Sequence, residues 1–466
     1  MIYNIIQTIK GISGTNDKIS YLSTLKNNDL FKRVLRLTYD DNLIFRIKKY
    51  DNPQTHLGNM SLEDALDALE FEFTQLKGAS NEARSRVLTI LTNLNENDAE
   101  VFKLILKKDL KCGISVKTIN KGFGYEFLRT PRYMGACSYS EKDIKKLFEK
   151  AKKTGSEVWS EIKFDGMYIN LFVENDICKP ESRGGKRVFV ERAFQNSITP
   201  AMNNNVFMGE LLVKGVDRYT SNGLINSYTT MREKDVNGEL SVKDIEKFYK
   251  RYGKKYDEIH NDIYMKVWDT VSIEEYEANK SNHPLKVRRA ILEGLLESVD
   301  TMTCVEHKVV SSIAEAMQEF KKAKENGEEG TIVKLSSVMW KDGKPKDQLK
   351  YKLEFDVEMQ VTGWLNGNPG TKYENFINRL ECMSADGLVN IRTSALTEDD
   401  MEMITSMGNE IIGKIITVQC SGLSENSKGE KSLLHPRFMV IRDDKTEADT
   451  YEKMQEIEEM CSSLGV

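Results

Sequence analysis

The chain has 466 residues, of which 39% are hydrophobic, and its 67 basic and 72 acidic side chains give a net charge of −5. This length predicts about three domains with real hydrophobic cores and excludes fibres and short peptides. No apolar run approaches the ~18 residues of a membrane-spanning helix, and the N-terminus lacks the pattern of a signal peptide, so we expect a cytoplasmic protein.

The cysteines and the local charges narrow the class of protein further. The seven cysteines stand singly, with no C-x-x-C pair, which argues against a disulfide framework or a four-cysteine zinc site and predicts reduced thiols. The net negative charge, taken alone, argues weakly against a nucleic-acid partner. However, residues 101–130 carry seven basic and two acidic side chains, whereas residues 51–100 carry three basic and ten acidic ones. The average charge can therefore hide a surface that is locally basic.

Residues 1–131 are predicted to form an all-α bundle. The first clear helical stripe consists of Leu62, Leu66, Leu69, Phe73 and Leu76. It follows a Ser61-x-x-Asp64 helix start, and similar stripes run through 87–94 and 102–106. The basic segment 101–130 lies at the end of this region.

Residues 132–354 are predicted to form an antiparallel α+β domain, because short alternating strands separated by helical stretches begin after Pro131. Expected strands lie at 157–175 (interrupted by a turn), 206–213, 263–271, 330–335 and 349–355. In the first of these segments, Ile169, Leu171 and Val173 share one face. Residues 355–466 contain further short strands at 357–364, 389–393, 414–422 and 437–442, which predict a small β-barrel before an acidic tail.

The sharpest local motif is Lys163-Phe164-Asp165-Gly166, where one strand stops and another begins. Asp-Gly suits a turn, so Lys163 is expected at a strand end. A free lysine has a pKa near ~10.4, and it attacks an electrophile only when burial or neighbouring cations favour its neutral form. Lys163 is therefore a candidate nucleophile, and we expect other cations beside it.

Further motifs follow Lys163 in order along the chain. They are Ser182-Arg183-Gly184-Gly185, Gly209-Glu210-Leu211, Val267-Trp268-Asp269, Glu329-Gly330-Thr331-Ile332-Val333-Lys334, Lys350-Tyr351-Lys352 and Arg442-Asp443-Asp444-Lys445. This ordered set resembles that of the ATP-dependent DNA ligases of the covalent nucleotidyltransferase superfamily, and the layout is similar to the T-even phage type over nearly the whole chain. Upstream, residues 109–115 and 117–120 resemble the end of the helical DNA-binding domain of that family.

The resemblance implies a three-step reaction. Lys163 would attack the α-phosphorus of ATP, releasing pyrophosphate and forming lysyl-AMP. AMP would then pass to the 5′-phosphate of a nick in double-stranded DNA, where the 3′-hydroxyl would displace it. Each step places negative charge on phosphoryl oxygens, so the site needs cations and a divalent metal.

The resemblance also assigns residues to these roles. The expected ATP-binding residues are Glu161, Ile162, Arg183, Glu210, Trp268, Lys334, Lys350, Lys352, Arg442 and Lys445. Glu210 and Glu329 would hold Mg²⁺ through hard oxygen ligands. Trp268 would stack on adenine, while Lys350 and Lys352, two apart in one strand, would face the same phosphate.

The resemblance predicts a domain for each region of the chain. These are a DNA-binding bundle at 1–131, an adenylylation domain at 132–354 and an OB-fold barrel at 355–466. The barrel would carry Arg442 and Lys445 over ATP and then swing away about a hinge near 354–356. Lys111, Lys117 and Lys121 would contact DNA phosphates without reading sequence, and the enzyme would act as a monomer that clamps the duplex.

One residue departs from the family pattern, which is K-x-D-G-x-R. Tyr168 stands at the arginine position, and a tyrosine cannot form the charged fork that arginine offers to phosphate. An RNA ligase or capping-type enzyme, and a non-catalytic DNA-binding protein on a ligase scaffold, remain alternatives. The basic N-terminal bundle with its segment 109–115, together with the terminal R-x-D-K, favours a DNA ligase. The absence of paired cysteines disfavours an NAD-dependent ligase.

Overall fold

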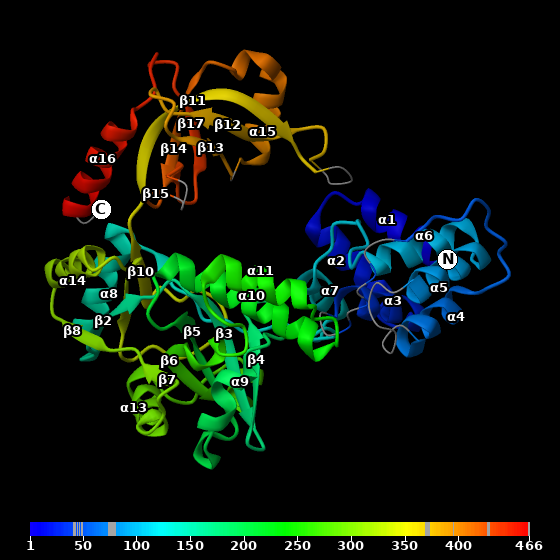
Figure 1. Cartoon of the computed structure of the whole chain (residues 1–466), viewed down its shortest axis with the longest axis horizontal. Helices are drawn as coiled ribbons and strands as arrows, with labels where there is room; N and C mark the ends of the chain where they lie inside the picture. The colour runs from blue at the N-terminus through cyan, green and yellow to red at the C-terminus, as the bar shows by residue number, and fades with distance from the viewer. Residues whose placement is uncertain are drawn as a thin grey trace. The chain divides into compact units, whose positions relative to one another are not determined.

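The computed structural model describes residues 1–40, 43, 45, 47, 50–72, 81–368, 373–394, 396–425 and 429–464. The chain is a mixed α+β protein whose sheets are mainly antiparallel (Figure 1). It divides into two compact units, Met1–Tyr133 with Met167–Tyr264, and Met134–Gly166 with Met265–Val466. Within the described residues, no helix has the length and apolar character needed to cross a membrane. The boundaries expected at 131/132 and 354/355 stay predictions.

The described residues of the first unit begin with a series of helices. They are α1 (Ile2–Gly11), α2 (Thr15–Thr24), α3 (Asp29–Tyr39), α4 (Leu62–Asp67) with a π-helical turn (Ala68–Glu72), α5 (Asn81–Asn93), α6 (Glu96–Leu106) and α7 (Val116–Phe123). Leu62, Leu66 and Leu69 are buried, and the Ser61–Asp64 capping box begins α4, as the sequence predicts. Phe73 and Leu76 lie outside the described residues. The stripes at 87–94 and 102–106 also enter this helical core.

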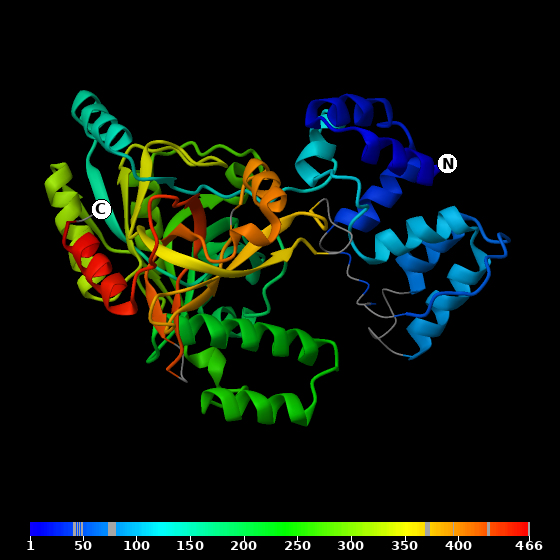
Figure 2. The ribbon, with the colours of Figure 1, turned by 90° about the horizontal axis from the view of Figure 1, so that it is seen from above.

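The rest of the first unit contains a three-strand antiparallel arrangement with helices. Its elements are β3 (Met167–Glu174), β4 (Ile177–Ser182), α9 (Glu191–Phe194), β5 (Asn205–Val213), α10 (Arg218–Val236) and α11 (Val242–Tyr252). β3 pairs with both β4 and β5. Ile169, Leu171 and Val173 of β3 are fully buried, but Asn170 and Phe172 between them are buried too, so β3 is covered on both faces. Helices α10 and α11 lie side by side (Figure 2), and the Ser227 and Tyr252 hydroxyls hydrogen-bond at 2.9 Å.

The second unit contains the five-strand sheet that carries Lys163. The strands are β1 (Cys137–Ser138), β2 (Val158–Lys163), β8 (His307–Val310), β9 (Gly330–Leu335) and β10 (Gln348–Lys352), in the order β1-β10-β9-β2-β8. Helices α8 (Glu141–Thr154) and α14 (Ile313–Glu325) contribute to the apolar core against this sheet. Only β1 runs parallel to its neighbour. β2 and β3 belong to different sheets, so the Asp165-Gly166 turn changes sheets and does not close a hairpin.

The remaining elements before residue 355 include two parallel strands at the end of the sheet of order β4-β3-β5-β6-β7. β6 (Ile263–Ser272) and β7 (Met302–Cys304) are parallel, and α12 (Ile273–Glu277) and α13 (Leu285–Leu296) lie between them in sequence. These parallel pairs depart from the predicted antiparallel pattern because a connection long enough to hold helices lets the chain return in the same direction.

Residues 355–464 form a second large sheet with two further helices. Its strands are β11 (Phe355–Asn366), β12 (Ile377–Met383), β13 (Asn390–Arg392), β14 (Ile415–Cys420) and β17 (Arg437–Ile441), in the order β13-β12-β11-β14-β17. A small hairpin (β15, Leu423–Glu425; β16, Lys431–Leu433), α15 (Glu398–Met407) and α16 (Tyr451–Leu464) complete the region. An isolated bridge joins Ser394, beyond β13, to Arg437 of β17. The OB-fold barrel itself stays a prediction.

Candidate active site

Lys163 is the last residue of β2, as the sequence predicts, and it faces a carboxylate from the neighbouring strand. Because β2 and β9 are antiparallel, the end of β2 meets the start of β9, and Lys163 is opposite Gly330. The preceding residue, Glu329, forms an ion pair with the Lys163 ammonium. The side chain of Lys163 is 25% exposed and that of Glu329 is 28% exposed. A Cβ at Gly330 would lie only 2.0 Å from the Tyr351 carbonyl oxygen, so only glycine allows β9 and β10 this close approach.

Two further lysines come from β10. Lys350 and Lys352 are partly buried on one face, whereas Leu349, Tyr351 and Leu353 are buried, which confirms the predicted alternation. Partial burial lowers the pKa of Lys350, and the ammonium groups of Lys352 and Lys163 lower it further. Lys352 also pairs with Glu354. The cations expected around Lys163 are therefore present.

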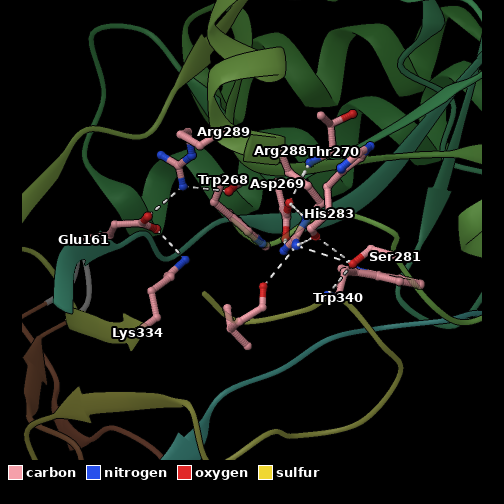
Figure 3. Close-up of polar contacts among 11 residues, drawn as sticks. Glu161, Trp268, Asp269, Thr270, Ser281, His283, Arg288, Arg289, Lys334 and Trp340 are labelled. Atoms are coloured by element: carbon pink, nitrogen blue, oxygen red, sulfur yellow. Dashed lines mark hydrogen bonds and ion pairs between the residues drawn. The ribbon is translucent and has the colours of Figure 1, made fainter. Parts of the chain in front are cut away.

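Glu161 lies two residues before Lys163, and its carboxylate is buried between two cations (Figure 3). Glu161 Oε1 accepts from Arg289 Nη2 at 2.6 Å, and Oε2 pairs with Lys334 Nζ at 2.6 Å. Lys334 is only 4% exposed, and its ammonium group neutralises the buried Glu161 carboxylate. Ile162, between Glu161 and Lys163, is partly buried. Contacts of Glu161, Ile162 and Lys334 with ATP stay predictions.

Trp268 of β6 is partly exposed, unlike the buried Trp159 and Trp340. Its stacking on adenine stays a prediction. The Trp268 carbonyl accepts a hydrogen bond from Arg289 Nη2 at 2.7 Å (Figure 3). The carboxylate of the next residue, Asp269, accepts two hydrogen bonds from the Arg288 guanidinium, at 2.8 and 2.7 Å. Consecutive arginines of α13 thus hold consecutive residues of β6.

Arg288 and Arg289 were not identified from the sequence, although a signal exists. The apolar stripe of α13 consists of Leu285, Leu292 and Leu296. Positions 288 and 289 fall on the same stripe, at steps of three and four from Leu285 and Leu292. Two arginines on a buried face indicate ion pairs with buried acids. Burial lowers the pKa of Arg289, but the Glu161 carboxylate raises it, and the net direction is upward.

Glu210, Tyr168 and Arg183 belong to the first unit. Tyr168 of β3 is directly opposite Glu210 of β5. The Arg183 guanidinium lies 4.0 Å from the centroid of the Tyr133 ring, and Tyr133 meets Tyr168 edge-on at 4.9 Å. The Tyr168 hydroxyl donates to Asn170 Oδ1 at 2.6 Å. Tyr168 therefore takes part in an aromatic support for Arg183 where the family pattern has an arginine.

No group of three or more His, Cys, Asp or Glu side chains suited to hold a metal is found within the described residues. Mg²⁺ needs no such protein cage, because it keeps several waters and binds through one or two carboxylates together with phosphates. The partly exposed Glu329 carboxylate fits that requirement. The joint role of Glu210 and Glu329 stays a prediction.

Arg442 and Lys445 are held by acids of their own region. Arg442 Nη1 donates a hydrogen bond to Glu358 Oε1 at 2.6 Å. Arg442 Nε and Nη2 donate to the two oxygens of the Asp444 carboxylate at 2.8 and 2.6 Å. Lys445 Nζ lies 3.7 Å from Glu358 Oε1. The hydrogen bond from Arg442 lowers the pKa of Asp444 to about 2. In this arrangement both cations are engaged by carboxylates.

The three predicted DNA-contacting lysines are all exposed. Lys117 and Lys121 lie four residues apart on α7, so they share one helix face. Lys111 lies in the turn before α7 with φ 52° and pairs with Asp109 at 2.8 Å. By contrast, the Lys108 ammonium, in the same basic segment, donates to the carbonyls of Leu37, Asp40 and Leu43. Lys108 therefore has a structural role.

Comparisons with known proteins agree on one family. Residues 136–352 match the family model described as ATP dependent DNA ligase domain. The chain is 27% identical to the DNA ligases of Enterobacteria phages T4 and T6, with 97% of this chain and 98% of each ligase covered. It is 24% identical to the DNA ligase of Escherichia phage T7 over 68% of this chain and 97% of that ligase. The solved structure named Pmar-Lig_PreS3 shares the fold, with a TM-score of 0.70 and 17% identity over 95% of this chain and 99% of that one.

Proposed function

The chain belongs to the ATP-dependent DNA ligases, and we propose that Lys163 is its nucleophile, that Mg²⁺ is its metal and that nicked double-stranded DNA is its substrate. The observation that carries the proposal is the Lys163–Glu329 ion pair beside Lys350 and Lys352, within the matched segment 136–352. Three cations converge there on one partly exposed strand end.

The first step transfers AMP from ATP to the protein. The neutral Lys163 amine attacks the α-phosphorus, a nitrogen–phosphorus bond forms, and the bond to the bridging oxygen of pyrophosphate breaks. The amine loses a proton, while Lys350 and Lys352 stabilise the phosphoryl charge that develops. Glu329 and Glu210 would hold Mg²⁺, which neutralises phosphoryl oxygens when bound. Trp268 would stack on adenine, and Arg183 would bind near the ribose or the nick phosphate.

The next two steps transfer AMP to DNA and seal the nick. An oxygen of the 5′-phosphate attacks the same phosphorus, the bond to Lys163 breaks, and the amine regains a proton. The 3′-hydroxyl oxygen then attacks the 5′-phosphorus and loses its proton, and AMP leaves. The protein binds, orients and neutralises charge throughout, as expected for transfer between phosphates.

The other regions would bind the duplex and complete the ATP site. We propose that residues 1–131 form a DNA-binding bundle with Lys111, Lys117 and Lys121 on phosphates. Residues 355–466 would form an OB-fold domain whose Arg442 and Lys445 orient pyrophosphate. We further propose that the enzyme is a monomer that clamps the duplex. The relatives from phages support action in the cytoplasm of an infected host.

A nick-sealing assay tests this function. The substrate is a duplex with one 5′-phosphate/3′-hydroxyl nick, incubated with ATP and Mg²⁺. We expect sealing that Lys163→Ala abolishes and that chelation of Mg²⁺ stops. Lys308→Ala is the matched control, because Lys308 is an exposed lysine of the neighbouring strand β8 and pairs with Glu319.

The alternatives give different results in the same assay. Sealing of RNA strands alone would indicate an RNA ligase, and a requirement for GTP would indicate a capping-type enzyme. DNA binding without sealing would indicate a non-catalytic protein. The similarity to phage DNA ligases over 97% of the chain, including the N-terminal helices, supports the DNA substrate.

A further inference from the structure

Arg289 is a fully buried cation that the reaction steps above do not use. Its side chain is 1% exposed, and its guanidinium donates to Glu161 Oε1 on β2 and to the Trp268 carbonyl on β6 (Figure 3). It also donates to the Val305 carbonyl just beyond β7. One side chain of α13 therefore connects three separate segments of the second unit.

The two contacts near the active site concern residues with proposed roles toward ATP. Glu161 and Lys163 are two apart in β2, so their side chains leave the same face of the strand. Trp268 carries the ring proposed to stack on adenine. The Arg289 guanidinium spans from Glu161 Oε1, at 2.6 Å, to the Trp268 oxygen, at 2.7 Å. The distance between the strand of the nucleophile and the strand of the stacking ring thus depends on this group.

Only arginine can make this set of contacts. A guanidinium has five N–H donors in a rigid plane, whereas a lysine ammonium is a single point on a flexible stem. Lysine at 289 could stay charged beside Glu161, but its one nitrogen cannot replace both Nη2, which donates to Glu161 and Trp268, and Nη1, which donates to Val305. Burying such a charge is costly without hydrogen-bond partners, so the contacts of Nη1 and Nη2 are needed to keep the side chain in place.

We propose that Arg289 is a positioning residue for adenylylation, which sets Trp268 and the Glu161–Lys163 strand at the separation that the adenine and α-phosphate of one ATP require. This inference rests on the proposed function of Lys163. Arg289 touches neither reacting atoms nor substrate in this account and acts through Glu161 and Trp268.

Arg288 provides a matched control on the same helix. It is equally buried, and its fork binds Asp269, while Nη1 donates to the carbonyls of His283 and Val338. Arg288→Lys and Arg289→Lys thus make the same chemical change at adjacent buried positions. Both are expected to lower the melting temperature.

The experiment measures the formation of the covalent AMP adduct over a range of ATP concentrations, together with thermal unfolding. For Arg289→Lys we expect the ATP concentration at half-maximal rate to rise about tenfold or more, because several oriented contacts are lost. The fraction of chains labelled at saturating ATP should stay as in the wild type. For Arg288→Lys we expect a lower melting temperature and an unchanged ATP concentration at half-maximal rate.

Three results would overturn the inference. One is an unchanged ATP dependence in Arg289→Lys. Another is an equal rise in both variants, which would indicate a general loosening of β6. The third is a smaller labelled fraction in Arg289→Lys without a change in ATP dependence, as expected of a residue that only stabilises the fold. If the wild type itself gives no adduct, the proposed function fails, and that result is distinct from all three.

Discussion

Lys350 is the residue whose environment gives a pH-dependent prediction. Partial burial lowers its pKa, and Lys352 and Lys163 lower it further, so in the folded protein Lys350 loses its proton below the ordinary lysine value of ~10.4. A neutral Lys350 holds phosphate less well. As the pH rises from ~8 to ~10, we expect the KM for ATP to rise in the wild type.

Lys350→Arg is the control for this prediction, because arginine stays protonated over the whole range. Its KM should rise less over the same interval, whatever its value at neutral pH. The depressed pKa also means that the unfolded chain binds more protons than the folded one in this window. The stability contribution of this group therefore increases as the pH rises through it. If the KM for ATP changed equally in the wild type and in Lys350→Arg, the loss of the Lys350 proton would not be the cause of the pH dependence.

The residues of the site differ in how far their positions could be predicted from the sequence. The positions of Lys163, Lys350 and Lys352 could be predicted, because each depends on strand periodicity within a few residues. Arg289 could not be paired with Glu161, which is 128 residues away and meets it only through the spatial arrangement of β2, β6 and α13. The role of Tyr168 depends on Tyr133, which also lies in a separate segment.

At the scale of elements, the contact between α2 and α7 depends on a missing side chain. A Cβ at Gly122 would lie 2.5 Å from Leu22 Cβ and 3.2 Å from the Ile19 carbonyl oxygen. Alanine would gain up to ~1 kcal/mol of helix propensity, but overpacking costs about 1–3 kcal/mol. We expect Gly122→Ala to lower the free energy of unfolding by about 1–2 kcal/mol in denaturant titrations.

Gly294→Ala is the matched control, because Gly294 lies inside α13 and no atom within 4 Å would meet its Cβ. That substitution should stabilise the protein by about 0.5–1 kcal/mol through helix propensity alone. Equal effects of the two substitutions would mean that α2 and α7 do not pack as described.

Element types were easier to predict from the sequence than sheet membership. The two lysines of β10 are partly exposed and alternate with buried residues, as the sequence pattern predicts, whereas β3, β5 and β9 are buried along most of their length. The sequence did not reveal that the Asp165-Gly166 turn leads from one sheet to another. A turn motif fixes local backbone direction, while the partner strand is chosen by contacts far along the chain.

At the scale of the whole molecule, the proposed closure of the C-terminal region predicts a separation of reaction steps. Arg442 and Lys445 are engaged by Glu358 and Asp444 in the structure, so they must exchange these partners to meet pyrophosphate. Lys445→Ala should slow self-adenylylation while largely sparing the sealing of nicks that already carry AMP. A comparable loss in both steps would contradict a role limited to the leaving group.

The net charge of −5 does not describe how the proposed DNA-binding region is charged, because residues 101–130 form a basic segment. Affinity for a nicked duplex should fall steeply with salt and be indifferent to base sequence. Replacing both Lys117 and Lys121 by alanine should reduce the slope of log affinity against log salt by about 2 in fluorescence anisotropy titrations. Replacing Lys321, an exposed lysine of α14, by alanine should leave the slope unchanged. An unchanged slope in the double variant would mean that Lys117 and Lys121 of α7 do not contact DNA phosphates.

Lys163 is proposed to carry AMP during the reaction, and mapping of the labelled peptide tests this role. The wild-type protein is incubated with α-labelled ATP and Mg²⁺ in the absence of DNA, digested, and its labelled peptide sequenced. We expect a single acid-labile AMP adduct on Lys163, which is absent from Lys163→Ala and discharged by adding nicked DNA. Label on another residue, or label from GTP or NAD only, would contradict it.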